Sequence, residues 1–324
     1  MILDSLLATY VKVFPWKFRY RWGAPFIGFL MGMRNNCVDF ANYRVYLNPR
    51  DKTATELFLV HFAAAGWIWE GYEISLFLSS VRANPGCLVL DIGANYGAYT
   101  LSAAHAAQQN EIRKIVAVEP NHETFACLTK SVAYNNFERY VHLAHAAVTD
   151  RHNVDCTVLA HETFSAMSRS TASLTGEVPP GHVALGTVRG VSIDGLLSEL
   201  GLDDSYPLII KIDIEGGEPL AFRGMQSTLR RAPGYHVYFE LHPKALKASG
   251  HDPVELGRRV FELEPDCVVE IDQHEKKLRP VRDLDAFQAI VAACDTATEM
   301  WKDYTNIFVG RGLPLPEEMD EFRG

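Results

Sequence analysis

The sequence predicts an α/β fold: a mostly parallel, seven-stranded sheet with helices on both faces, preceded by an N-terminal helical extension. Three observations lead to this prediction. From residue 87 onward, short apolar and β-branched runs alternate with longer helical patterns, as in β-α-β units. Several of the short runs are apolar almost throughout, which is typical of strands buried on both faces. With 324 residues, 48% of them hydrophobic, the chain is long enough to bury a large core.

The elements follow in order from local patterns. Apolar and β-branched residues predict strands at 87–92, 114–119, 140–145, 207–212, 235–241, 266–271 and 304–310. Apolar residues at helical spacing predict helices at 98–108, 122–134 and 219–231, and Asp194 is the expected N-cap of a helix at 195–200. Residues 153–190 combine Ser, Thr, Gly and Pro with short β-prone pieces, so we expect a hairpin-bearing insertion there.

Charge and length suggest how the chain is organised. We expect an N-terminal extension at 1–69, the α/β domain at 70–312 and a C-terminal tail at 313–324. The chain has 31 Lys and Arg against 40 Asp and Glu, a formal charge of −9, so no basic field exists to bind a phosphate backbone. Nucleic acid is therefore not an expected partner, and we expect a small-molecule or glycan substrate.

The first 34 residues differ from the rest in charge. They interleave the aromatic residues Trp16 and Trp22 with five basic residues against one acid. This composition fits peripheral contact with an anionic membrane, and equally a helical arm packed across the sheet or between subunits. The six cysteines show no paired spacing, and the start of the chain lacks the pattern of a secretory signal. We expect a cytoplasmic location, with membrane association through residues 1–34 as a second possibility.

The strongest local signal is a glycine-containing turn after the strand at 87–92. This G-x-x-x-G turn opens a helix and contains Gly93, Ala94, Asn95 and Gly97. At such a turn, the backbone can approach a ligand closely. This spacing matches neither the dinucleotide fingerprint nor the P-loop. Asp91 in the strand would repel a pyrophosphate but favours a cationic ligand such as the sulfonium of S-adenosylmethionine.

A second acid completes this unit. Glu119 ends the next strand, 22 residues after Gly97, where a carboxylate can accept hydrogen bonds from both ribose hydroxyls. The order of turn, helix, strand and acid predicts a Rossmann-like sheet that binds S-adenosylmethionine.

Five sequence blocks resemble one family. The blocks are D-I-G-A-N-x-G-x-Y-T, A-V-E-P-N, S-I-D-G-L-L, I-K-I-D-I-E-G-G-E and F-E-L-H-P. Over about residues 70–243, they are similar to successive blocks of FkbM-type S-adenosylmethionine-dependent methyltransferases. The resemblance implies a class I methyltransferase sheet and O-methylation of a hydroxyl on a sugar, glycan or polyketide-like natural product. It also implies positions around the cofactor: Asp91, Gly93, Ala94, Asn95 and Gly97 at the methionine part, Glu119 at the ribose and Asn121 near the adenine.

Polar residues end two further predicted strands. Asp213 and Glu215 follow the strand at 207–212, and Glu240 and His242 end the strand at 235–241. The carboxyl ends of parallel strands meet at one edge of a sheet, so we expect these four residues to form the catalytic group.

Two chemistries fit this group. In the first, His242 or Glu215 is a general base that removes the proton of a hydroxyl. In the second, Asp213 and Glu240 hold a divalent cation, as carboxylates do in metal-dependent catechol methyltransferases. We prefer the metal-free version, with S-adenosylmethionine as the cofactor. Asp213 as a helix cap and His242 as an ordinary strand-end residue remain structural alternatives.

Two other functions use the same architecture. An NAD-dependent oxidoreductase needs G-x-G-x-x-G, which is missing here, and Asp91 also counts against it. A protein that binds S-adenosylmethionine without catalysis is the other alternative, because fold does not determine function.

Overall fold

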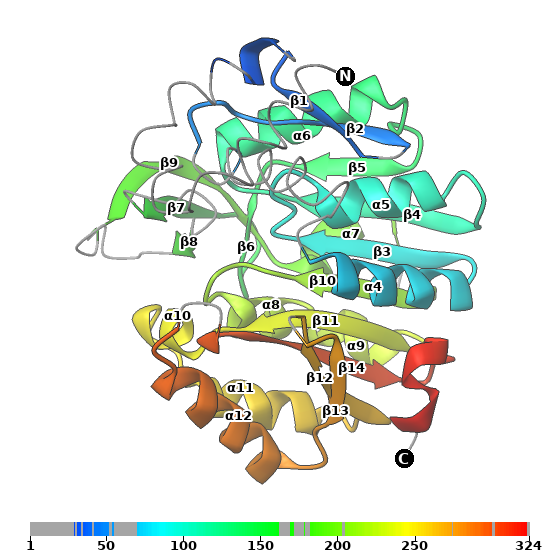
Figure 1. The fold of residues 1–324 in the computed structure, drawn as a ribbon, viewed down its shortest axis with the longest axis vertical. Coiled ribbons are helices and arrows are strands. Elements are labelled where there is room, and N and C mark those ends of the chain that lie inside the picture. The colour runs from blue at the N-terminus through cyan, green and yellow to red at the C-terminus, as the bar shows by residue number, and fades with distance from the viewer. Residues whose placement is uncertain are drawn as a thin grey trace.

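A central sheet of eight strands forms the middle layer of the molecule (Figure 1). The computed structural model describes residues 29, 31–33, 35–40, 42–51, 54, 70–161, 169–171, 178, 182–202, 205–273, 275–299 and 302–322. The strands follow the order β13-β12-β14-β11-β10-β3-β4-β5. Their bounds are Cys87–Ile92 (β3), Ile112–Val118 (β4), Val141–Ala144 (β5), Leu208–Ile212 (β10), Tyr235–Leu241 (β11), Cys267–Asp272 (β12), Lys277–Pro280 (β13) and Thr305–Arg311 (β14).

The sheet is mostly parallel, as predicted. The parallel part of the sheet consists of β11, β10, β3, β4 and β5. β14 runs antiparallel between β11 and β12. All seven predicted strands take part, but the predicted number is wrong by one, because β13 pairs antiparallel with the outer side of β12. The segment Lys277–Pro280 is largely exposed and lacks the apolar pattern that identifies the other strands.

Helices cover both faces of the sheet. One buried core lies under α4 (Gly71–Ala83), α5 (Ala98–Ala106) and α6 (His122–Tyr134), and the other lies under the helices of the opposite face. The opposite set consists of α7 (Ile193–Glu199), α8 (Glu218–Gly224), α9 (Gln226–Arg231), α10 (Pro243–Ala248), α11 (Pro253–Glu262) and α12 (Leu284–Thr296). The short 3-10 helix η3 (Glu317–Phe322) places Met319 in the first core.

The order of the strands creates a crevice at one edge of the sheet. From β3 the chain continues outward through β4 and β5, and it then returns to β10 on the other side of β3. In open α/β sheets, ligands bind at the carboxyl ends of the strands where the strand order reverses. Here the loops after β3 and β10 begin at Gly93 and Asp213.

A second, four-stranded sheet carries most of the predicted insertion. Its strands are β6 (Ala147–Val148), β7 (Val154–His161), β8 (Arg169–Thr171) and β9 (His182–Val191), in the order β6-β9-β7-β8. β7 pairs antiparallel with both β8 and β9, so the hairpin predicted within 153–190 is confirmed. Figure 1 shows this sheet to one side of the central sheet.

Part of the predicted N-terminal helical extension is β-structure. β1 (Cys37–Phe40) and β2 (Tyr43–Tyr46) form an antiparallel hairpin, because alternating Val, Tyr and Phe side chains favour strands. The hairpin contacts α6, where the Tyr46 N–H donates to Ser131 Oγ at 2.8 Å. Residues 1–28, which contain most of the basic and aromatic arm, lie outside the described residues.

Two details of the predicted helices are wrong. The N-cap of α7 is Ser192, whose hydroxyl accepts from the N–H of Gly195. Asp194 instead accepts from the N–H groups of Ser227 and Thr228 at the start of α9, so it joins two helices. The helix predicted at 219–231 is interrupted at Met225, whose φ of −119° leaves the helical region.

Among the described residues, no helix combines the length and the apolar character that crossing a bilayer requires.

Candidate active site

The turn after β3 is shaped by contact with the loop after β10. Gly93 has φ of +85°, and a Cβ on it would lie 1.8 Å from the backbone oxygen of Asp213. Only glycine fits this position, since any side chain would push the two loops apart. Asn95 also has a positive φ, 50°, and the glycine at position 97, with φ of +92°, precedes α5. Ala94, between Gly93 and Asn95, is buried.

Asp91 holds this turn against α5. Its side chain is buried, and Oδ2 accepts from the N–H of Thr100 at 2.9 Å and from the Thr100 hydroxyl at 2.5 Å. Burial raises the pKa of Asp91 to about 6, although the two bonds from Thr100 and the charge of Lys211 act in the opposite direction. The carboxylate therefore has a fixed orientation at the base of the crevice.

Glu119 lies one residue beyond β4 and connects the turn to α6. Its Oε2 accepts from the N–H of Asn95 at 2.9 Å, and its Oε1 accepts from the N–H of Asn121 at 2.8 Å. Burial raises the pKa of Glu119 to about 7, and the two backbone bonds oppose that rise. Asn121 is the N-cap of α6, because its Oδ1 accepts from the N–H of Glu123 at 3.0 Å.

The structure brings the four residues of the expected catalytic group together. His242 Nδ1 lies 3.7 Å from Glu215 Oε2 and 3.7 Å from Glu240 Oε1. Burial raises the pKa of Glu240 well above its ordinary value, and the charges of Asp213 and Glu215 raise it further. Asp213 contacts Gly93, so the group borders the same crevice as the glycine turn.

The state of His242 follows from its neighbours. Burial alone would lower its pKa, but the nearby carboxylates of Glu215 and Asp303 outweigh burial and raise it. Its Nε2 lies 3.8 Å from Asp303 Oδ2, so each ring nitrogen faces a carboxylate. This arrangement favours the imidazolium form, which has no lone pair with which to accept a proton.

Several acids and one lysine of the site were not predicted. Glu70, immediately before α4, accepts from the Tyr99 hydroxyl at 3.0 Å. Burial raises the pKa of Glu70 to about 7, with the charge of Lys211 acting against the rise. Lys211 is buried in β10, with Nζ 3.2 Å from Glu73 Oε1 and 3.8 Å from Asp213 Oδ2.

One of these omissions had a sequence signal. Lys211 is the single charged residue in the apolar strand Leu208–Ile212, and a lysine buried in that way requires an acidic partner. The partner, Glu73, lies 138 residues earlier in the chain, so the pairing itself is visible only in the fold.

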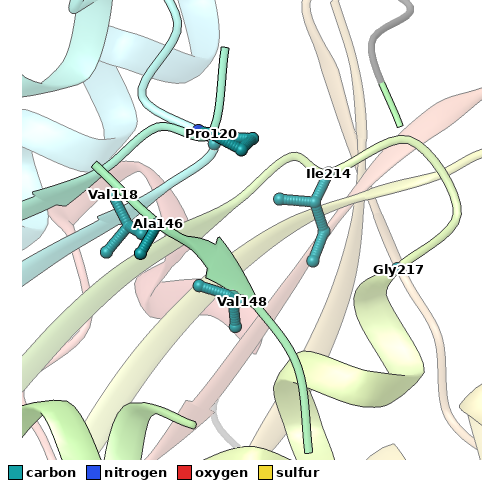
Figure 2. Close-up of a pocket in the computed structure, with 7 residues that line it drawn as sticks. Val118, Pro120, Ala146, Val148, Ile214 and Gly217 are labelled. Atoms are coloured by element: carbon teal, nitrogen blue, oxygen red, sulfur yellow. The ribbon is translucent and has the colours of Figure 1, made fainter. Parts of the chain in front are cut away.

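A small apolar pocket lies beside Glu119. It is lined by Gly93, Val118, Pro120, Ala146, Val148, Ile214 and Gly217. Figure 2 shows Val118, Pro120, Ala146 and Val148 on one side and Ile214 on the other. The loops after β3, β4 and β10 thus contribute to one pocket, which offers apolar contact to a flat ring.

Comparison with known proteins adds a family match. A sequence model of the methyltransferase FkbM domain matches residues 91–273, which is more than half of the chain. The match includes the glycine turn, Glu119, Asp213 and Glu240. No curated protein matches the sequence.

Three solved structures have a remote likeness to the chain. A methyltransferase FkbM from Methylobacillus flagellatus KT is 12% identical, with a TM-score of 0.38 over 79% of this chain and 53% of that one. This chain therefore spans about half the length of that protein. A putative methyltransferase from Streptococcus mutans, solved in complex with SAH, is 10% identical, with a TM-score of 0.39 over 75% of this chain and 99% of that one. A SAM-dependent O-methyltransferase from Thermotoga maritima is 11% identical, with a TM-score of 0.36 over 76% of this chain and 67% of that one.

Proposed function

The chain belongs to the FkbM methyltransferase family, whose methyl donor is S-adenosylmethionine, and we propose that it methylates a hydroxyl oxygen of a small molecule or glycan. One observation carries this proposal. The glycine turn that begins at Gly93 and the acidic loop that begins at Asp213 are in contact, so donor site and reactive acids share one crevice. The catalytic unit in this proposal is residues 70–312.

The proposed donor site uses the turn, the acid after β4 and the apolar pocket. Glu119 accepts hydrogen bonds from the ribose hydroxyls with its remaining lone pairs, because backbone N–H groups already orient both of its oxygens. The adenine ring lies in the pocket between Pro120 and Ile214 (Figure 2). The methionine part lies over the turn Gly93–Gly97, where Asp91 supplies negative charge close to the sulfonium.

Methyl transfer is a displacement in line with the bond that breaks. The acceptor oxygen forms a bond to the methyl carbon as the bond from carbon to sulfur breaks, which leaves S-adenosylhomocysteine and a methyl ether. The hydroxyl proton must go to a base, and Glu215 is the proposed base. Glu215 Oε2 is buried without a hydrogen-bond partner among the described residues, and it lies 3.7 Å from His242 Nδ1.

The acceptor class rests on the chemistry of the crevice. Carboxylates accept hydrogen bonds, so Asp213, Glu215 and Glu240 together offer several sites for the hydroxyls of a polyol. We propose a sugar, a glycan or a polyketide-like product, each of which presents neighbouring hydroxyls. The excess of acidic groups disfavours anionic acceptors.

A mass-spectrometric screen tests this function. Purified enzyme and S-adenosylmethionine are added to extracted cellular glycans and lipids, and products that gain one methyl group are identified. We expect a methyl ether, formed only when donor and enzyme are both present, with release of S-adenosylhomocysteine. A methyl group located on nitrogen or carbon of the product would contradict O-methylation.

A further inference from the structure

Three carboxylates from three separate elements converge in the crevice. Glu70 immediately precedes α4, Asp213 immediately follows β10, and Glu240 lies near the end of β11. One oxygen of each lies within 4.8 Å of one oxygen of each of the others. Three negative charges this close repel one another strongly, so the folded chain must bring protons or a cation to them.

The two basic side chains in the crevice are shared between these carboxylates and other acids. Lys211 Nζ lies nearest to Glu73, at 3.2 and 3.4 Å from its two oxygens, and only 3.8 Å from Asp213. His242 lies between Glu240 and Glu215 at its Nδ1 and faces Asp303 at its Nε2. Acidic groups therefore outnumber the two basic groups in this part of the crevice.

A second observation points to a bound group beside Glu240. Asn306 in β14 is fully buried, yet neither its Oδ1 nor its Nδ2 has a hydrogen-bond partner among the described residues. Asn306 is the direct partner of Glu240 in the β11–β14 pair, so both side chains leave the sheet on the same face, about 5 Å apart. Burying an amide without partners costs about 1–3 kcal/mol, which a water bound to an ion, or the ion itself, would offset.

We propose that Glu70, Asp213 and Glu240 bind one divalent cation of the hard class, Mg²⁺ or Mn²⁺, with Asn306 contacting the cation or one of its waters. Carboxylate and amide oxygens are the ligands that these ions prefer. The group Glu215, Glu240 and His242 is equally compact, but it includes a nitrogen ligand, whereas Glu70, Asp213 and Glu240 offer only the oxygen ligands that hard cations prefer.

This inference rests on the proposed function and deepens it. The backbone oxygen of Asp213 packs against Gly93 of the donor turn, and its carboxylate is a proposed ligand of the cation, so an acceptor hydroxyl can coordinate the ion while its oxygen faces the donor. Coordination lowers the pKa of the hydroxyl, and the proton still leaves to Glu215. Acceptors with two neighbouring hydroxyls would bind most tightly, because both oxygens can coordinate one ion.

Manganese binding to the full chain tests the site without any acceptor. After removal of bound metals with a chelator, Mn²⁺ is titrated, and the free ion is measured by electron paramagnetic resonance. We expect one site per chain in the wild type. Glu70→Gln and Asp213→Asn should each lower the affinity for Mn²⁺ at least about tenfold. Glu215→Gln and the surface change Asp295→Asn should leave this affinity unchanged. Melting curves of all variants show whether each one is folded.

The outcomes separate the cation site from the function. Absence of a Mn²⁺ site in wild-type protein that binds S-adenosylmethionine overturns the cation site and leaves the methyltransferase intact. Loss of Mn²⁺ binding in Glu215→Gln with retention in Glu70→Gln overturns the assignment of ligands. Glu119→Ala should lose donor affinity and keep Mn²⁺ affinity, so a failure of the donor site is recognised independently.

Discussion

Burial raises the pKa of several acidic side chains that orient the loops of the crevice. Glu218 is the clearest example, because its oxygens accept from the N–H groups of Ile214 and Gly216 and hold the loop after β10 in place. Burial raises its pKa to about 7, and these backbone bonds oppose the rise. The carboxyl group is therefore protonated more readily in the folded chain than in the unfolded chain.

The pH dependence of stability should reveal this shift. Between the ordinary pKa of 4.5 and about 7, the folded chain holds more protons at Glu218 than the unfolded chain does, so this contribution to the free energy of unfolding falls as pH rises. A shift of this size corresponds to about 3 kcal/mol. Glu218→Gln cannot titrate, so relative to the wild type it should gain up to that amount between pH 5 and pH 8 in urea unfolding. Exposed Glu255→Gln is the control, and parallel pH curves for Glu218→Gln and the wild type would argue against the shift.

Glu119 should contribute to donor binding more than its neighbours do. Glu119→Ala removes the acceptor for the ribose hydroxyls and the partner of the Asn95 N–H, so S-adenosylmethionine affinity should fall by about 1–3 kcal/mol. Isothermal titration measures the change. Glu123→Ala, in the first turn of α6, should leave affinity unchanged. A folded Glu119→Ala variant with wild-type affinity would remove Glu119 from the donor site.

Residues at strand ends were predictable, and residues brought in from loops were not. Four residues of the site lie at or just after the ends of apolar strands, and parallel strands place such residues at one edge of the sheet. These residues are Asp213, Glu215, Glu240 and His242. Glu70 has no comparable pattern in sequence, since its position depends on how α4 packs against β10. Tertiary packing likewise determines the positions of Asp303, Tyr99 and Asn306 at the site.

At the scale of elements, the loops after β3 and β10 approach each other at Gly93. Gly93→Ala would place a Cβ 1.8 Å from the Asp213 oxygen, so one of the two loops must move. Gly86 is a matched control, because its φ of +76° is similar and nothing lies within 4 Å of its Cβ position. Gly86→Ala should cost about 1–2 kcal/mol from backbone strain alone.

Gly93→Ala should lower the free energy of unfolding more than Gly86→Ala does, and it should also weaken S-adenosylmethionine binding. Urea unfolding and isothermal titration measure the two effects. Equal stability of the two variants, with donor affinity unchanged in Gly93→Ala, would show that the loops are not in tight contact.

The buried ion pair between β10 and α4 offers a second test at this scale. Lys211→Met leaves Glu73 without its charged partner in a fully buried position and should destabilise the chain by about 3–5 kcal/mol. Adding Glu73→Leu should recover much of that loss, since the fully buried charge nearest to Lys211 is then also removed. Exposed Lys302→Met should cost at most about 1 kcal/mol. A double variant less stable than Lys211→Met would contradict a pairing of Lys211 with Glu73.

Elements with strong apolar patterns were predictable, and those that depend on partners were not. The strands at 87–92 and 235–241 are buried throughout, so their composition alone indicates them. β13 is exposed and short, and it exists because β12 offers an open edge. The Asp194 prediction fails for a similar reason, since the N–H groups that it binds belong to another helix.

At the scale of the whole molecule, the sheet order determines where chemistry takes place. The reversal between β3 and β10 brings the donor turn, Glu119 and the strand-end acids to the carboxyl edge of the sheet. Helices on both faces bury the rest of the sheet in two cores, which leaves the carboxyl edge as the natural binding region. A ligand bound there contacts several loops at once, so it should stabilise the entire fold.

Thermal unfolding with cofactors tests the central claim most directly, namely that this crevice binds S-adenosylmethionine. At a hundred times its dissociation constant, the ligand should add about 2.7 kcal/mol to the free energy of unfolding, so the melting temperature should rise. S-Adenosylhomocysteine should have a similar effect, and NADH should have none. No shift with S-adenosylmethionine at millimolar concentration, together with stabilisation by NADH, would contradict the methyltransferase assignment and support an oxidoreductase.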